Sequence, residues 1–148
     1  MRPLARSLPL KLLSVREAVM ERFRPHLHAH GLTEQQWRVL RALAEEVELD
    51  VGTLSRRITL LMPSLSRMLP DLERRGLIAR RKSSDDARLI LARLTEAGQA
   101  LFATVGRESE RVYAEIEARV GRDALDRLLG DLDAFQDKLA GSASDRSG

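Results

Sequence analysis

The sequence has no cysteine and few aromatic residues. Cysteine is absent from all 148 residues, and Phe, Trp and Tyr together make up 3% of the chain. The absence of cysteine excludes disulfide bonds, thiolate metal sites, cysteine nucleophiles and thiol-based redox sensing. Any function must therefore rest on other side chains.

Long apolar runs are also missing. No run approaches the ~18 consecutive apolar residues that a membrane span requires. The first residues, MRPLARSLPLKLL, include apolar positions but no small-residue cleavage site, so they do not resemble a signal peptide. We therefore expect a cytoplasmic protein without a membrane partner. With 43% hydrophobic residues, the 148-residue chain can form about one domain with a sizeable core.

Positive charge is concentrated in the middle of the chain. Residues 51–95 contain 10 Lys and Arg against 4 Asp and Glu, whereas residues 96–148 contain 7 against 11. A basic centre of this kind is a candidate surface for a polyanion. The alternative is a solvated surface with no partner, and charge alone does not decide between them.

Apolar residues at helical spacing predict four helices in the first half of the chain. The first covers residues 10–30, with a kink expected at Pro25. The second opens with a capping box of Thr33 and Gln36, and Leu32 can staple against Trp37. The third covers residues 50–58 and the fourth residues 62–75. The predicted buried stripe of the second helix is Trp37, Leu40, Leu43 and Val47.

The pattern changes after the fourth helix. Two short β-rich runs, LIARRK and RLILARL, are joined by SSDDA and predict a hairpin with a polar tip. Thr95 is expected to cap a long helix that Gly121 breaks, and a final helix follows. Residues 141–148 have no large apolar side chain, so we expect a disordered tail there.

These elements predict a mainly α fold with a small β-hairpin wing. The third and fourth helices are joined by about four residues and have the size of a helix-turn-helix. The hairpin behind them makes residues 33–95 a winged helix-turn-helix. The helices in residues 1–32 and 96–140 have apolar stripes outside this core. A two-fold homodimer would bury those stripes, although they could instead pack on their own domain.

This layout resembles the MarR family, the multiple-antibiotic-resistance regulators. The resemblance covers about residues 10–140 and is carried by LTEQQWRVLRAL, MPSLSRML, LERRGLIARR, DDAR and LTEAGQAL. One stretch, REAVMERFRP…LTEQQWRVLRALAE, resembles more closely the repressors of homoprotocatechuate-degradation operons. The resemblance implies a winged-helix dimer that represses transcription from a palindromic operator. It also implies release from that operator by a small aromatic acid.

The fourth helix presents two faces when each residue is rotated by 100°. Leucines form one face, which we expect to be core. Arg67 lies on the opposite face and has a fork of donors for a guanine edge. Serines in the first turn suit a phosphate or a base edge. The alternative is an ordinary exposed arginine. The predicted DNA-contacting residues of this helix are Ser64, Ser66, Arg67 and Arg74.

Proline in the middle of the fourth helix is unexpected, since it costs ~3 kcal/mol in a helix interior. Pro70 faces outward, so the carbonyl group that it frees on Ser66 points to water or DNA. The helix could bend at Pro70 or begin again there, and the sequence leaves both open.

In the wing, the basic candidates for DNA contact are Arg80, Lys82 and Arg88. The family resemblance implies that Arg88 enters the minor groove and that Asp86 orients it through a salt bridge. The wing of the family usually reads Asp-Arg-Arg, whereas this chain has Ala87 between Asp86 and Arg88. One wing arginine is therefore missing. The alternative is a charged hairpin tip without a partner.

The resemblance also implies a ligand site between the dimer helices and the winged region. Arg16, Trp37 and Arg38 are the candidates there. An arginine can pair with a carboxylate, and a tryptophan can stack on an aromatic ring. The alternative is that Trp37 is only the helix staple and Arg16 only a salt-bridge partner.

Two histidines suggest a second hypothesis, a metal-responsive DNA-binding regulator. His26 and His30 are four residues apart and could share a helical face, a spacing that can bind zinc. Arg22, one turn earlier, would repel a metal, and no cluster of other ligands is evident. We therefore expect no metal and no cofactor.

Enzyme motifs are not apparent in the sequence. It has no nucleophile elbow, phosphate loop or His/carboxylate pair at a helix start, so we expect no enzyme. A DNA-binding protein without sequence preference remains a further alternative, which competitor DNA would test.

Overall fold

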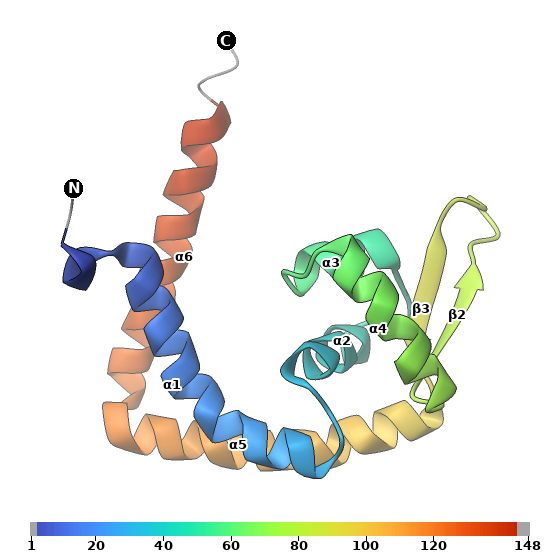
Figure 1. Ribbon diagram of the computed structural model, residues 1–148, viewed down its shortest axis with the longest axis horizontal. Coiled ribbons are helices and arrows are strands. Elements are labelled where there is room, and N and C mark those ends of the chain that lie inside the picture. The colour runs from blue at the N-terminus through green and yellow to red at the C-terminus, as the bar shows by residue number, and fades with distance from the viewer. Residues whose placement is uncertain (1–2, 145–148) are drawn as a thin grey trace. The chain divides into compact units, whose positions relative to one another are not determined.

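The computed structural model describes residues 3–144. Contacts between residues divide it into two compact units, and the division falls between Ser109 and Glu110, inside one long helix. None of the helices in residues 3–144 is long and apolar enough to cross a membrane. The elements in chain order are a 3₁₀ turn (Leu4–Arg6), α1 (Leu8–Ala29), α2 (Glu34–Ala44), β1 (Leu49–Asp50), α3 (Val51–Arg57), α4 (Met62–Arg74), β2 (Ile78–Lys82), β3 (Ile90–Leu94), α5 (Glu96–Val120) and α6 (Arg122–Ser144) (Figure 1).

Helix α1 runs through its internal proline. Ser7 caps its start by accepting a hydrogen bond from the Leu10 N–H at 3.4 Å. Pro25 does not end the helix, which continues to Ala29. The residue four positions before it, Glu21, is exposed, so the carbonyl group left without its usual donor can reach water.

Helix α2 opens with the predicted capping box. The Gln36 N–H donates to Thr33 Oγ1 at 3.1 Å, and the Thr33 N–H donates to Gln36 Oε1 at 3.0 Å. The prediction for Val47 was wrong. The helix ends at Ala44, and Val47 is 91% exposed because it lies in the loop that follows.

The wing belongs to a three-stranded antiparallel sheet in the order β1-β3-β2. The predicted hairpin is present, with Ile78 opposite Leu94 and Lys82 opposite Ile90. The third strand, β1, was not predicted. It has two residues, too few to show an alternating pattern, and Leu49 pairs with Ala92.

The core of the winged region is made by leucines from every helix of the helix-turn-helix. Leu40, Leu54, Leu65 and Leu72 are all fully buried. Further fully buried side chains in this region are Leu32, Val39, Leu43, Leu69 and Ile78.

The first turn of helix α5 lies directly against the backbone of Leu77. The Gly98 N–H donates to Thr95 Oγ1 at 3.0 Å, which confirms Thr95 as the cap. A Cβ atom at Gly98 would overlap the backbone carbonyl oxygen of Leu77. Only glycine allows this approach of helix to backbone.

The second unit contains the rest of α5 and all of α6. Gly121 separates the two helices, as predicted, with a positive φ of 84° that a glycine adopts without strain. Helix α6 extends to Ser144 and so includes the first four residues of the segment 141–148 predicted as a disordered tail. Small residues can continue an existing helix when no proline follows. Residues 145–148 lie outside the described residues.

Candidate nucleic-acid interface

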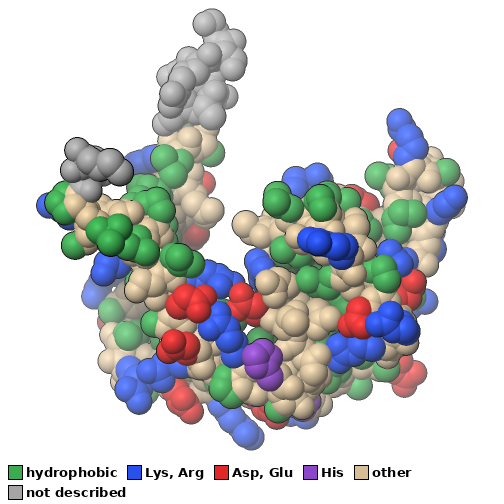
Figure 2. Space-filling view, viewed as in Figure 1, with side chains coloured by type: hydrophobic (Ala, Val, Ile, Leu, Met, Phe, Trp, Pro, Cys, Tyr) green, Lys and Arg blue, Asp and Glu red, His purple; other side chains and the backbone are tan. Residues whose placement is uncertain are grey.

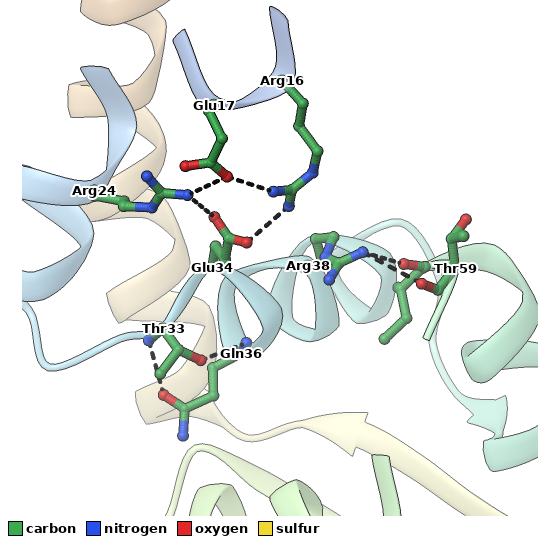
Figure 3. Close-up of polar contacts among 9 residues, drawn as sticks. Arg16, Glu17, Arg24, Thr33, Glu34, Gln36, Arg38 and Thr59 are labelled. Carbon is green, nitrogen blue, oxygen red and sulfur yellow. Dashed lines mark hydrogen bonds and ion pairs between the residues drawn. The ribbon is translucent and has the colours of Figure 1, made fainter. Parts of the chain in front are cut away.

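The turn between α3 and α4 is held in a strained conformation. Thr59 has a φ of 53°, a left-handed conformation that β-branched residues rarely adopt. Arg38 Nη1 reaches across from α2 and donates to the Ile58 carbonyl at 2.7 Å (Figure 3). Ser55 Oγ, on α3, donates to the Leu60 carbonyl. These two side chains fix the position from which α4 begins.

Helix α4 has the two faces that the sequence predicted. Leu65, Leu69 and Leu72 are buried against the core. The predicted DNA-contacting residues lie on the opposite side, where Ser66, Arg67 and Arg74 are exposed and Ser64 is half-buried. Pro70 is exposed as well and the helix continues through it to Arg74, without beginning again.

A polar network ties the back of α4 to α2. Gln36 Nε2 donates to Asp71 Oδ2 at 3.0 Å. Asp71 also pairs with Arg74, and with Arg75 at 3.7 Å. Arg75 in turn donates to the Gly31 carbonyl at 3.0 Å. Arg74 is thus held by an acidic partner on its own helix, although its side chain stays 72% exposed.

Arg80 in the wing is tied to α4. Its backbone N–H donates to Glu73 Oε2 at 3.1 Å, and its Nη2 atom lies 3.2 Å from Glu73 Oε1. The hydrogen bonds from Arg80 lower the pKa of Glu73, which therefore stays charged at neutral pH. Lys82, at the end of β2, is exposed.

The tip of the wing presents one arginine on an acidic support. Arg88 Nε and Nη2 each lie 3.0 Å from an oxygen of Asp86, and the Arg88 side chain is 89% exposed. Hydrogen bonding to Arg88 lowers the pKa of Asp86, and the same bonds raise the pKa of Arg88. The pair forms with Ala87 between its members, so the missing second arginine does not prevent it.

Helix α4 and the wing together line a groove of about 500 Å³. Three of the predicted residues, Ser66, Arg80 and Arg88, line it. Arg56 of α3 lines it too and was not singled out in the sequence, although it lies in the basic segment 51–95. The groove thus places three guanidinium groups and one carboxylate, that of Asp50, beside α4. The positive charges outnumber the negative one, which suits a phosphate backbone.

Comparisons with known proteins agree with this geometry. The MarR family model matches residues 32–90. The homoprotocatechuate degradative operon repressor of Escherichia coli is 41% identical over 129 residues, which are 87% of each chain. The chain belongs to the MarR family. It is a DNA-binding transcriptional repressor of that family, and its relatives are regulators, not enzymes.

Two solved structures are similar to this member of the MarR family. NadR in complex with 4-hydroxyphenylacetate is 38% identical with a TM-score of 0.79, covering 92% of this chain and 96% of that one. CouR bound to a 23-mer DNA duplex is 28% identical with a TM-score of 0.81, covering 90% and 94%. Both likenesses extend over nearly the whole chain.

The predicted ligand residues of this MarR-family chain all have partners. Arg16 Nη2 lies 2.8 Å from Glu34 Oε1, and Arg24 Nη2 lies 3.4 Å from Glu34 Oε2 (Figure 3). Glu17 pairs with both arginines, and its hydrogen bond with Arg24 lowers the pKa of Glu17. This cluster joins α1 to the first turn of α2.

Arg38 lies close to the same cluster. Burial lowers its pKa, and the nearby charge of Arg16 acts in the same direction. Its Nε atom is buried and has no hydrogen-bond partner among the described residues. Arg38 lines a hollow of about 670 Å³ together with Arg41 and Arg57. Sequence reasoning missed Arg41, which is one turn after Trp37 on α2.

Trp37 is separated from this hollow. Its ring is 6% exposed and stacks on Phe102 of α5, with ring centroids 5.4 Å apart. The structure therefore brings Arg16 and Arg38 into one neighbourhood and places Trp37 against α5.

The two histidines join α1 to α5. His26 Nε2 lies 2.9 Å from Ser109 Oγ, and His30 Nε2 lies 3.1 Å from Glu108 Oε2. Burial lowers the pKa of His26. Residues 3–144 contain no group of three or more His, Cys, Asp or Glu that could hold a metal ion. The described residues therefore offer no third metal ligand beside His26 and His30, so the structure adds no support to the metal-responsive alternative.

Proposed function

We propose that this chain is a cytoplasmic homodimeric repressor that binds a palindromic operator and is released by a small aromatic acid. The observation that carries the proposal is the exposed face of α4 beside three arginines in one groove. CouR, a relative in fold, is bound to DNA in its structure, and NadR is bound to 4-hydroxyphenylacetate.

In the proposed complex, α4 enters the major groove and the wing reaches the neighbouring minor groove. Arg67 reads a base edge, because its side chain is exposed in the first half of α4 and has a fork of donors. The phosphate backbone of DNA is contacted by Ser64, Ser66, Arg74, Arg80 and Lys82. Arg88, supported by Asp86, enters the minor groove.

The dimer rests on apolar side chains that one copy of the chain leaves exposed. They lie on α1 and α6 and include Leu12, Leu13, Leu128, Leu129 and Phe135, which are 42–55% exposed. A two-fold axis would bury such stripes and give two recognition helices about one DNA turn apart.

The ligand site is proposed at the Arg16–Arg38 neighbourhood. Arg16 already has a carboxylate partner, so the carboxylate of a ligand would replace Glu34 at that guanidinium. The unpaired Nε of Arg38 offers a further donor. Trp37 is left out of this site, because its side chain is buried against Phe102 of α5. Arg38 also holds the turn before α4, which gives a route from ligand to DNA.

Release requires that the ligand prefer a form of the dimer that fits DNA poorly. The coupling is reciprocal, so operator DNA must weaken ligand binding by the same factor, typically ~1–3 kcal/mol. The test is to titrate operator complexes with 4-hydroxyphenylacetate. We expect the wild type to dissociate and Arg16→Ala to bind operator normally but resist release. The control is Arg22→Ala, an exposed arginine on the same helix. An unchanged release curve for Arg16→Ala would move the site elsewhere.

DNA reading is tested separately with Arg67→Ala. The variant should lose about 1–3 kcal/mol of operator binding and become less selective at one base pair. Arg107→Ala, which removes an exposed arginine from α5, is the control. Wild-type affinity and base preference in Arg67→Ala would show that a different face of the protein reads DNA.

A further inference from the structure

We propose that Leu61 and Met62, at the start of α4, read thymine methyl groups in the major groove of the operator. The inference rests on the DNA-binding function proposed above. It adds an apolar component to a surface whose other contacts are charged or polar.

The start of α4 differs from the starts of the other helices of the first unit. Helices α1, α2, α3 and α5 are preceded by Ser7, Thr33, Asp50 and Thr95, and each of these side chains accepts a hydrogen bond from a backbone N–H. Helix α4 is preceded by Leu61, whose side chain makes no capping hydrogen bond. Leucine is among the least favourable residues at this position, because its side chain cannot accept a hydrogen bond. Pro63 has no N–H to cap, and the Ser64 N–H donates to the Leu61 carbonyl at 3.0 Å.

The same short segment breaks two more local rules. Leu61 is 78% exposed and Met62 is 43% exposed, although both are large and apolar. Thr59, two residues before Leu61, is in the left-handed conformation. Departures of this kind gather at functional or strained sites, since they persist only where something compensates for them.

The surroundings indicate DNA as the compensating partner. Ser64 and Arg67 follow on the exposed side of the same helix, and three arginines line the adjacent groove. Figure 2 shows hydrophobic side chains gathered over the α3–α4 region with Lys and Arg beside them. The apolar group that the major groove offers is the thymine C5 methyl. A side chain at the beginning of a recognition helix is among those that reach base edges.

One variant separates this role from folding. Leu61→Asn replaces the leucine with a favoured capping residue whose side chain can accept from the Ser64 N–H, so the helix should be at least as stable as in wild type. The same change removes the apolar contact. We therefore expect an unfolding temperature no lower than that of wild type together with weaker operator binding, a combination that misfolding cannot produce. Met62→Gln tests the second side chain in the same way without shortening it.

The experiment uses duplexes selected from a random library by the wild-type protein. Each thymine is replaced in turn by deoxyuridine, which keeps the hydrogen-bonding edges and lacks only the methyl group. We expect about a fourfold loss of wild-type affinity for each contacted methyl, the equivalent of one buried methylene group. At the base pair that Leu61 contacts, the Leu61→Asn variant should bind the thymine and deoxyuridine duplexes equally. Val47→Asn removes an exposed apolar side chain outside α3 and α4 and should behave as wild type.

The outcomes distinguish the inference from the proposed function. If no duplex is enriched over scrambled competitor, the DNA-binding function itself fails. If duplexes are enriched but deoxyuridine has no effect at any position, the methyl contact is wrong and operator reading stands. If deoxyuridine weakens wild type, Leu61→Asn and Met62→Gln equally, another residue makes the contact and the inference is overturned.

Discussion

The winged region and helix α6 have similar apolar patterns but opposite exposure. In the winged region, Leu40, Leu54 and Leu65 are fully buried. In α6, Leu128, Leu132 and Leu139 are 47%, 37% and 59% exposed. Helical spacing of apolar residues therefore identifies the face that will be buried, but it does not identify the partner. In the winged region the partner lies within the chain, whereas for α6 we propose that the partner is a second copy of the chain.

Helix α1 shows the same contrast along its own length. Phe23 and Leu27, near its end, are buried, whereas Leu12 and Leu13 near its start are 43% and 55% exposed. The change occurs along one continuous helix, so it reflects what lies beside each turn. We infer that the first turns of α1 belong to the dimer surface and the last turns to the monomer core.

Removal of α6 should have the largest effect. A chain that ends at Gly121 should lose its dimer and much of its stability, because the apolar stripe of α6 would be missing from the proposed dimer surface. Operator affinity should fall by about 10²–10⁴-fold, the gain that linking two binding modules provides. Sedimentation measures the oligomeric state, and fluorescence anisotropy measures operator affinity. A chain that ends at Ser144 is the control, and a stable monomer with wild-type affinity from the shorter chain would refute the comparison.

Leucine truncations should sharpen the contrast between the two regions. Leu40→Ala should lower the free energy of unfolding by about 2–5 kcal/mol, since Leu40 is fully buried. Leu129, which is 52% exposed in one copy, should instead affect association. Urea unfolding at several protein concentrations tells the two apart. Leu129→Ala should lower the unfolding free energy by weakening association, so that stability depends less on protein concentration than in wild type once the dimer dissociates, and equal behaviour of both variants would count against the dimer surface.

The polar link between α2 and α4 should matter less than a core leucine. Gln36→Glu keeps the capping box but places a carboxylate against Asp71, so we expect a loss of about 1–3 kcal/mol in unfolding free energy. Adding Asp71→Asn supplies a new donor and should restore part of that loss, which urea unfolding measures. Gln35→Glu is the matched control. Asp71→Asn should add more stability to Gln36→Glu than it adds to the wild type. If it does not, the hydrogen bond between Gln36 and Asp71 does not link the two helices.

The smallest effect is expected where α1 meets α5. Burial lowers the pKa of His26, so the folded protein favours its neutral form. As the pH falls through the unfolded value of 6.5, the unfolded chain takes up a proton first and stability declines until the folded pKa is passed. Two neighbouring groups have smaller effects on the pKa of His26: Glu108 raises it and His30 lowers it. His26→Gln should flatten the thermal stability profile between pH 7 and 5 relative to wild type and to His30→Gln; an unchanged profile would exclude His26.

Much of the fold could be predicted because its signals are local. The capping box at Thr33, the glycine at position 121 and the alternating hairpin depend on residues a few positions apart. Two features were missed for a physical reason. Strand β1 has only two residues, and Val47 continued an apolar spacing beyond Ala44, where the helix ends. Strand β1 depends on β3, which is distant in the sequence and pairs with Leu49.

The candidate site was less predictable than the fold. The exposed face of α4 followed from helical geometry, and Arg88 followed from family resemblance. The acidic partners of Arg16 and Arg80 did not, because Glu34 and Glu73 lie on other elements. Whether an arginine is free for a ligand depends on such distant neighbours. Periodicity carries no information about them.

The close approach at Gly98 limits how this protein can vary. A side chain there would collide with the carbonyl oxygen of Leu77, and a backbone atom cannot move aside as a flexible side chain can. In a library that carries every amino acid at each position, Gly98 should accept no replacement, not even alanine. The neighbouring exposed position Glu96 should accept many. A single hydrogen atom in place of a methyl group thus keeps the long helix seated on the winged region, and selection should preserve it regardless of which operator or effector the protein recognises.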